Sequence, residues 1–235
     1  MEAIRQAAAN AIDVRNVKKI YRVGSVSINA LNGVDLCVPA GECCCIIGRS
    51  GSGKSTLLNV LAGLEKPTSG EIVVANMHVE RMTQSELILF RQQHVGFIFQ
   101  SFNLMPYYTA LENVALPLAF RGIEKYKREK KAREILKAVG LGTHLNHKPT
   151  QMSGGQQQRV GIARALVSDP EIVFADEPTG NLDSKTSDEV LKLIWDIVKS
   201  QGRTLVMVTH DPGISSYADV VINLLDGKVQ QIETA

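Results

Sequence analysis

The chain is most constrained by residues 48–55, which read Gly-Arg-Ser-Gly-Ser-Gly-Lys-Ser and fit the pattern G-x-x-x-x-G-K-[ST] at every fixed position. The apolar run 43–47 precedes this segment and predicts a buried strand, and leucines at helical spacing follow in 56–64. A strand, a glycine-rich loop and a helix start form a cradle for phosphate, because backbone N–H groups turn inward and the helix N-terminus adds partial positive charge. An ordinary glycine turn is the alternative, and the flanking strand and helix disfavour it.

Two side chains of this segment, which we call the phosphate loop, have the chemistry to bind a nucleotide and its cation. Lys54 is expected to reach the terminal phosphates, and the Ser55 hydroxyl is expected to hold Mg²⁺. The residues expected to contact the nucleotide here are Gly48, Arg49, Ser50, Gly51, Ser52, Gly53, Lys54, Ser55 and Thr56.

Length and charge limit the remaining possibilities. The 235 residues suit one large domain or two small ones. A formal net charge of +2 gives no reason to expect a nucleic-acid partner, since domains that bind nucleic acid usually have a strong basic bias. No apolar run approaches the ~18 residues that cross a bilayer, and residues 1–11 lack the sustained apolar region of a secretory signal. We therefore expect a cytosolic chain.

The four cysteines are Cys37, Cys43, Cys44 and Cys45. Three in a row cannot form a normal disulfide among themselves, because neighbouring side chains of a strand point to opposite faces. The chain has no C-x-x-C pair, which disfavours a zinc site. They are expected to act as small apolar residues of a buried strand. A redox role for Cys37 with the other three stays open.

The pattern along the chain predicts a mainly parallel sheet with helices on both faces, because buried strands alternate with helical segments. The segments 126–139 and 184–200 read as helices, within a region that is helical in character from 101 to about 167. The basic run 125–137 is expected to be a solvated helix face. Turns are expected at Asn32-Gly33, 39–41 and 226–227. The runs expected to be strands are 12–21, 26–31, 34–38, 43–47, 72–75, 95–99, 172–175, 205–209, 220–225 and 228–232.

Two carboxylates, Asp176 and Glu177, directly follow the apolar run 172–175. In a parallel sheet, ligands gather beyond the carboxyl ends of the strands, where the phosphate loop is also expected. Adjacent residues at a strand end point differently, so each carboxylate can have its own role. Asp176 is expected to support Mg²⁺ through water, and Glu177 to polarise the attacking water or accept its proton. A pair of exposed acids without a chemical role is the alternative.

Two further polar residues follow predicted strands at the same sheet edge. His210 comes directly after 205–209 and is a candidate contact for the terminal phosphate. Gln100 follows 95–99 and is a candidate ligand for Mg²⁺ or for the attacking water. Either residue alone is a weak signal, because loop histidines and glutamines are common. The other histidines, including His144 and His147, are interpreted as loop residues.

The segment Ser153-Gly154-Gly155-Gln156, which we call the second glycine loop, precedes another helical run. Ser153 is a good N-cap, and two glycines beside it expose backbone N–H groups at a helix start, which makes a second anion site. One triphosphate does not need two such sites in one chain. If each site belongs to a different subunit, two copies arranged head to tail enclose two nucleotides, and hydrolysis releases the pair.

In this order, the phosphate loop, the second glycine loop, Asp176-Glu177 and His210 resemble the motifs of the ATP-binding subunit of ABC transporters. The likeness covers about residues 12–232. Met152 stands where the family usually has leucine, a change that conserves volume. Within the family, the chain is most similar to ATPases of the macrolide-export and lipoprotein-release type. The segments that carry this likeness are 21–24, 30–31, 97–104, 109–114 and 175–184.

This resemblance implies an α/β fold of the P-loop NTPase (RecA-like) kind, with an N-terminal antiparallel β subdomain and a helical subdomain at about 101–168. Residues 12–235 would then form one ATPase domain after a tail, 1–11. The resemblance also implies that Tyr21 stacks on the adenine and that Asn181 to Asp183 form the loop that signals between the two nucleotide sites. It places Asp183 among the residues that contact the nucleotide.

Partners follow from the same resemblance. The expected partners are a second ATPase subunit and an integral membrane permease that contacts the chain around residues 102–116. Because the chain has no membrane span and no obvious substrate pocket, transport requires another chain. The expected location is the cytoplasmic face of the membrane, and export or extraction from the membrane is favoured over import.

Two other classes of function stay open. One is an ATP-gated switch of the cell-division type, which signals through a membrane partner without transport. The other is a soluble DNA-repair or ribosome-associated ATPase of the same family. The interval from Lys54 to Ser153 is too short for the coiled coil of repair members, and each motif occurs once, unlike in the tandem ribosome-associated members.

Overall fold

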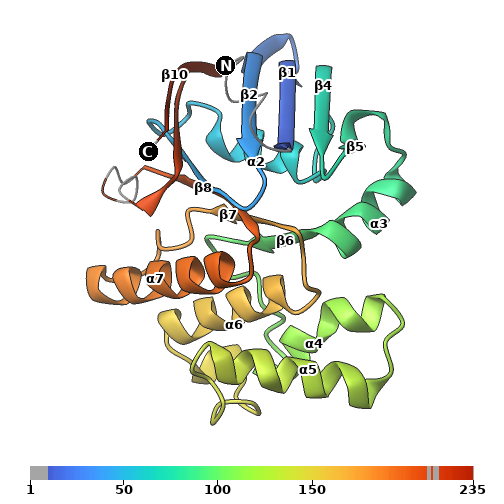
Figure 1. Cartoon of the computed structure of the whole chain (residues 1–235), viewed down its shortest axis with the longest axis vertical. Coiled ribbons are helices and arrows are strands. Elements are labelled where there is room, and N and C mark those ends of the chain that lie inside the picture. The colour runs from blue at the N-terminus through green and yellow to red at the C-terminus, as the bar shows by residue number, and fades with distance from the viewer. Residues whose placement is uncertain (1–9, 211–212, 214–216, 235) are drawn as a thin grey trace.

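The computed structural model describes residues 10–210, 213 and 217–234, and it places two β-sheets above a group of helices (Figure 1). Residues 1–9 of the predicted N-terminal tail lie outside the described residues. The first strand begins at Asn10, two positions before the predicted start at residue 12. The division into one domain with a tail and a helical subdomain stays a prediction.

The smaller sheet is antiparallel and has the strand order β2-β1-β4-β5. Its strands are β1 (Asn10–Val23), β2 (Val26–Pro39), β4 (Ser69–Val74) and β5 (Met77–His78). The break predicted at Asn32-Gly33 is wrong, because β2 runs through it. Gly33 has φ 78, and the pairing with β1 shifts register between Val17/Val34 and Lys18/Asn32, so the glycine forms a bulge rather than a turn.

The larger sheet has six strands in the order β10-β9-β3-β8-β7-β6. All its pairs are parallel except β10 with β9, which confirms the mainly parallel sheet. Its strands are β3 (Cys43–Ile47), β6 (Val95–Ile98), β7 (Ile172–Asp176), β8 (Thr204–Thr209), β9 (Val220–Leu225) and β10 (Lys228–Thr234).

The helices lie on both faces of the larger sheet. They are α2 (Lys54–Leu61), α3 (Gln84–His94), α4 (Ala110–Phe120), α5 (Lys125–Ala138), α6 (Gly154–Leu166) and α7 (Ser184–Ser200), with short 3₁₀ turns at Val79–Arg81 and Pro149–Gln151. Sequence reasoning missed α3, although its start has a recognisable signal. Thr83 accepts the backbone N–H of Glu86, and the Glu86 carboxylate accepts the backbone N–H of Thr83, a capping box.

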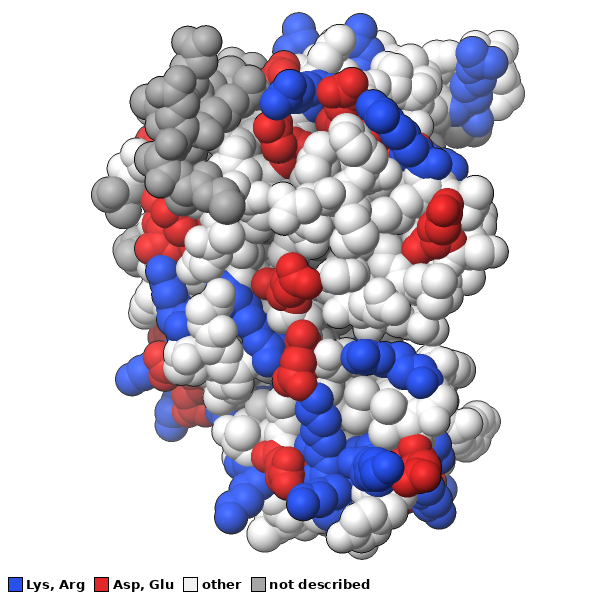
Figure 2. Space-filling model, turned by 45° about the vertical axis from the view of Figure 1, so that its right-hand side comes forward, with Lys and Arg blue, Asp and Glu red and all other residues white. Residues whose placement is uncertain are grey.

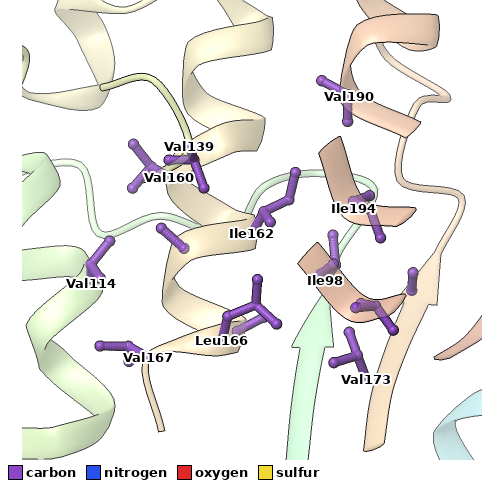
Figure 3. Packing of buried hydrophobic residues seen from close by; sticks show 14 of the residues in the cluster. Ile98, Val114, Val139, Val160, Ile162, Leu166, Val167, Val173, Val190 and Ile194 are labelled. Atoms are coloured by element: carbon purple, nitrogen blue, oxygen red, sulfur yellow. The ribbon is translucent and has the colours of Figure 1, made fainter. Parts of the chain in front are cut away.

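Two hydrophobic cores form on opposite faces of the larger sheet. One lies between that sheet, the antiparallel sheet and α2, and the other joins the sheet to α4, α5, α6 and α7. In Figure 3, Ile162 and Leu166 of α6 lie between Val114 of α4 and Ile98 of β6, so α6 packs between the sheet and the other helices.

The four cysteines are buried and form no disulfide, as expected of apolar strand residues. Cys43 and Cys45 belong to the helical core and Cys44 to the opposite one, because successive strand side chains alternate between faces. Burial raises the pKa of the Cys43 thiol to about 12. A thiol with so high a pKa is a poor nucleophile at neutral pH.

Helix α5 carries the basic run of the sequence, and Figure 2 shows Lys and Arg side chains, with Asp and Glu among them, over the lower part of the molecule. Lys127 pairs with Glu124 at 3.0 Å, and Lys131 pairs with Asp169. Exposed pairs of this kind contribute little to stability. Their presence agrees with a solvated helix face.

Among the described residues, no helix combines the length and the apolar character that crossing a bilayer requires.

Candidate nucleotide site

The phosphate loop joins β3 to α2, as the sequence predicted. Gly51 and Gly53 have φ 80 and 99, which only glycine adopts readily. A Cβ on Gly53 would lie 2.4 Å from the Ala30 carbonyl oxygen, and one on Gly48 would lie 2.3 Å from that of Leu224. Glycine is therefore required at both positions, by conformation or by close backbone packing.

Lys54 lies inside the curve of this loop and is only 5% exposed. Its Nζ donates to the carbonyl oxygens of Gly48 at 2.9 Å and Arg49 at 3.0 Å. A buried ammonium needs such acceptors, since burying an unpaired charge is costly. The loop therefore holds the Lys54 ammonium at its centre, where a phosphate oxygen can replace a carbonyl as its partner.

Ser55 of the phosphate loop and Asp176 of the Asp176-Glu177 pair lie side by side. The Ser55 hydroxyl donates to Asp176 Oδ1 at 2.9 Å, across the gap between α2 and the end of β7. Burial raises the pKa of Asp176; the hydrogen bond from Ser55 opposes this shift, and the neighbouring Glu177 adds to it. Hydroxyl and carboxylate oxygens are the ligands that Mg²⁺ prefers, and a cation here would relieve the cost of burying this carboxylate. The pair fits a divalent cation.

Glu177 and His210 also lie side by side. His210 Nδ1 is 3.2 Å from Glu177 Oε2, and the Glu177 N–H donates to the Val208 carbonyl at 3.0 Å. Glu177 has φ 40, a strained value for a residue other than glycine, and such strain is concentrated at functional sites. Both residues line a cavity of about 270 Å³ at this sheet edge, together with Gly180, Asp188 and Thr209. The predicted base and the predicted phosphate contact thus share one cavity.

Gln100 reaches the turn after β7 rather than the Ser55–Asp176 pair. A Cβ on Gly180 would lie 2.8 Å from Gln100 Nε2, and Asn181 donates to the Gln100 carbonyl at 2.9 Å. Within the part of the chain that is described, no hydrogen bond joins Gln100 to Ser55 or Asp176. Its predicted role as an Mg²⁺ ligand stays a prediction.

Gln158 is a buried residue of this region that sequence reasoning missed. It is fully buried on α6, and its Nε2 donates to the Pro178 carbonyl at 2.6 Å. This bond ties the helix of the second glycine loop to the turn that follows the two carboxylates. The only signal in the sequence is a polar residue on the inward face of a helix, which is not specific.

The second glycine loop starts α6, as predicted. Ser153 caps the helix: its hydroxyl accepts the Gln156 N–H at 3.3 Å, and the Ser153 N–H donates to Gln156 Oε1 at 3.0 Å. The N–H groups of Gly154 and Gly155 in this first turn have no acceptor within the helix. A Cβ on Gly155 would lie 2.5 Å from Thr186 Cγ2, so this glycine also lets α6 approach α7.

Within the described residues, the glycines of the two loops pack against different neighbours. The phosphate loop packs against Ala30, Leu224 and Gly227, and the second glycine loop packs against Phe102, Leu182 and Thr186. In Figure 1, α2 lies in the upper half of the molecule and α6 in the lower half. One chain therefore presents, at two separate places, the two loops that are predicted to bind anions.

Tyr21 lies in β1 and is anchored by a residue that the sequence did not single out. Its hydroxyl donates to Glu65 Oε2 at 2.6 Å, and Lys19 Nζ lies 3.2 Å from the same oxygen. Burial, then the hydrogen bond with Glu65, raises the pKa of Tyr21, and a hydrogen bond with Thr56 lowers it. Tyr21 is therefore next to Thr56 of the phosphate loop. Stacking of its ring on adenine stays a prediction.

Asp183 is the N-cap of α7. Its Oδ1 accepts the backbone N–H of Thr186 at 3.1 Å, and this hydrogen bonding lowers the pKa of Asp183. The carboxylate thus fixes the helix start that packs against Gly155. The nucleotide contact that the resemblance implies for Asp183 stays a prediction.

The segment 102–116, the predicted permease contact, combines exposed aromatic side chains with a fixed backbone. Tyr107 is 85% exposed. Asn113, fully buried on α4, accepts the Met105 N–H at 2.8 Å and donates to the carbonyl oxygens of Met105, Tyr108 and Thr109. One buried amide thus holds the loop that displays the exposed aromatics.

Replacing Asn113 with alanine is expected to lower the free energy of unfolding by about 2 kcal/mol, because its fully buried side chain is lost and the Met105 N–H and the Tyr108 carbonyl lose their partner. The Met105 and Thr109 carbonyls each keep a backbone N–H as partner. Urea unfolding followed by circular dichroism measures this change. The exposed Asn146 is the matched control, and Asn146→Ala should change stability by less than about 0.5 kcal/mol. Equal effects of the two substitutions would contradict the anchoring role of Asn113.

Comparison with known proteins agrees with these observations. A family model described as ABC transporter matches residues 31–180. The lipoprotein-releasing system ATP-binding protein LolD of Geobacter metallireducens is 44% identical over 221 residues, which cover 94% of this chain and 98% of that protein. The macrolide export ATP-binding/permease protein MacB of Syntrophobacter fumaroxidans is 42% identical over 221 residues, which cover 93% of this chain and 31% of that longer protein.

A solved structure is also similar. The ATP-binding cassette MJ0796, in a dimeric post-hydrolysis state bound to ADP and Pi, has a TM-score of 0.88 and 44% sequence identity over 95% of this chain and 98% of that one. This likeness confirms the predicted P-loop NTPase fold and the predicted ATPase activity. The chain therefore belongs to the ABC transporter family, as one of its ATP-binding and ATP-hydrolysing cassette subunits.

Proposed function

We propose that this chain is a motor subunit that closes on a second copy of itself around two ATP molecules and drives a separate membrane permease. The observation that carries the proposal is the separation of the two glycine loops within one chain, each with its own set of neighbours. A phosphate bound in the first loop of one copy is then covered by the second loop of the other. The dimeric form of the similar cassette supports this arrangement.

Each side chain of the site has a distinct task in this proposal. Lys54 binds the terminal phosphates. Ser55, and Asp176 through water, would hold Mg²⁺, which would neutralise phosphate charge when bound. Glu177 accepts a proton from the attacking water, and His210, 3.2 Å from Glu177, orients that carboxylate and contacts the terminal phosphate. Gln100 joins them when the cavity closes, and Tyr21 stacks on the adenine. Ser153, Gly154, Gly155 and Gln156 bind the phosphates of the other copy.

The permease is proposed to dock on the segment 102–116 at the cytoplasmic face of the membrane. This segment displays Tyr107 on a backbone fixed by Asn113, and Arg164 of α6 donates to the Phe102 carbonyl at 2.8 Å. Movement of α6 on nucleotide closure therefore reaches the docking segment directly. The combined ATP-binding/permease relative supports a permease partner, and both relatives favour export or extraction from the membrane.

A single added cysteine tests the docking surface, because all four native cysteines are buried. Tyr107→Cys, labelled with a maleimide that carries a benzophenone, is expected to cross-link on illumination to an integral membrane protein when the chain is expressed with its native membranes, because benzophenone inserts into C–H bonds and needs no partner thiol. Glu233→Cys, on the exposed strand β10, is the control and should give no such product. Mass spectrometry identifies the partner. Equal cross-linking at both positions, or no membrane partner at Tyr107→Cys, would reject this docking surface.

A further inference from the structure

The amide of Gln156 in the second glycine loop has a partner outside its own helix. Gln156 Oε1 accepts the Ser153 N–H at 3.0 Å, and Gln156 Nε2 lies 3.3 Å from His144 Nε2. His144 Nδ1 in turn lies 3.1 Å from the Thr143 hydroxyl. His144 is partly buried in the loop between α5 and α6. The polar contacts that cap the start of α6 therefore extend through Gln156 to His144.

The donors and acceptors of this chain of contacts can be assigned. A backbone N–H only donates, so the Gln156 atom that faces Ser153 must be the oxygen. The other amide atom, Gln156 Nε2, then donates to His144 Nε2. His144 Nε2 must therefore be an unprotonated acceptor. A neutral imidazole with this acceptor carries its proton on Nδ1, which donates to Thr143 Oγ1. All three contacts are satisfied only when His144 is neutral.

We propose that His144 is a positioning residue of the nucleotide site: its neutral imidazole fixes the Gln156 amide, and thereby the cap of the second glycine loop that covers ATP on the partner copy. This inference rests on the proposed shared site. A protonated His144 would present an N–H to the Gln156 amide nitrogen, two donors facing each other. Turning the amide over would satisfy His144 and place the NH₂ group against the Ser153 N–H. Protonation and an intact cap therefore exclude each other.

The surroundings of His144 include a second histidine. The ring of His144 packs against that of His147, with centroids 4.9 Å apart. Helix α4 packs on the same loop through the Ala110 N–H and the His147 carbonyl. The charged residue of α4 is Glu112, which is bonded to Thr109, and that of the loop next to His147 is Lys148. Helix α6 carries Arg159, paired with Glu189, and Arg164, which donates to the Phe102 carbonyl. In the described part of the chain, no carboxylate forms an ion pair with His144.

The inference is tested by the pH dependence of ATP-driven dimerisation, measured on the full chain with Glu177→Gln to suppress hydrolysis. Between pH 8 and pH 5.5, across the usual titration range of histidine, the dimer dissociation constant is expected to rise about tenfold, because two caps per dimer are weakened. Adding His144→Gln should abolish most of this rise, since a glutamine oxygen can take the place of Nε2 and does not titrate. The matched control, His147→Gln, should retain the rise.

Nitrogen-15 spectra of the imidazoles give a second readout that does not depend on dimerisation. At pH 8 His144 is expected in the Nδ1–H tautomer, and its titration should move the side-chain amide signal of Gln156. A different tautomer, or a Gln156 signal that does not change as the pH is lowered, would overturn the proposal. Identical pH dependence of the dimer dissociation constant with and without His144→Gln would also overturn it. If no ATP-dependent dimer forms at pH 8 in any variant, the proposed shared site fails instead.

Discussion

Replacing Glu177 with glutamine is expected to lower the rate of ATP hydrolysis by about 10²–10³-fold while leaving ATP binding intact. The carboxylate lies beside His210 in the cavity at the sheet edge, where glutamine has the same shape but cannot accept a proton. Because bound ATP then persists, the variant should accumulate as a closed dimer. Phosphate release measures the first effect, and light scattering with and without ATP measures the second.

The matched control for this substitution is Glu134→Gln, which removes an exposed carboxylate of α5 far from the cavity. It should hydrolyse ATP at the parental rate and show no stable dimer after turnover. Parental hydrolysis by Glu177→Gln would show that another group accepts the proton. His210 would then be the next candidate, since it is the titratable side chain in contact with Glu177.

Replacing Lys54 with alanine is expected to weaken ATP binding by about 10²-fold, because charge-assisted hydrogen bonds to the terminal phosphates are lost from a site with little access to water. Fluorescence of a nucleotide analogue measures the dissociation constant. Lys130→Ala, at an exposed position of α5, should bind ATP like the parent. Thermal unfolding shows whether the loop stays folded once Gly48 and Arg49 lose their shared partner. An unchanged affinity in a folded Lys54→Ala protein would remove Lys54 from the site.

The parts of the fold that could be predicted from sequence are those decided by local patterns. Continuous apolar runs predicted the parallel strands, and helix α7 has its predicted bounds because Asp183 caps it and apolar residues recur on one face. The turn predicted at Asn32-Gly33 is wrong. The pair has the composition of a turn, but the residues on both sides of it pair with β1, and Gly33 forms a bulge within β2. Such long-range pairing is not visible in a short window of sequence.

The residues of the candidate site also divide into those that a local sequence pattern identifies and those that only a long-range contact identifies. The phosphate loop and the Asp176-Glu177 pair carry their own sequence patterns, and the structure brings them together through the bond between Ser55 and Asp176. Glu65, Gln158 and His144 have no pattern of their own. Each becomes relevant only through a contact with a distant segment, as Glu65 does with Tyr21. Tertiary geometry, rather than residue type, identifies them.

A mixing experiment tests most directly whether each nucleotide site is shared between two chains. One variant is Lys54→Ala, with an intact second glycine loop. The other is Gly154→Asp, which places a carboxylate against the bound phosphate. The fold tolerates this change, because a Cβ on Gly154 is 3.4 Å from its nearest neighbour and aspartate suits the first turn of a helix. Gly154→Ala is the neutral control.

Each variant alone should be nearly inactive. In a mixed dimer, the intact phosphate loop of one chain meets the intact second glycine loop of the other and completes one site. Since half of randomly formed dimers are mixed, the mixture should recover about a quarter of the parental ATP hydrolysis rate. A mixture no more active than the sum of its two parts, with mixed dimers present, would contradict a site built from two copies of this chain.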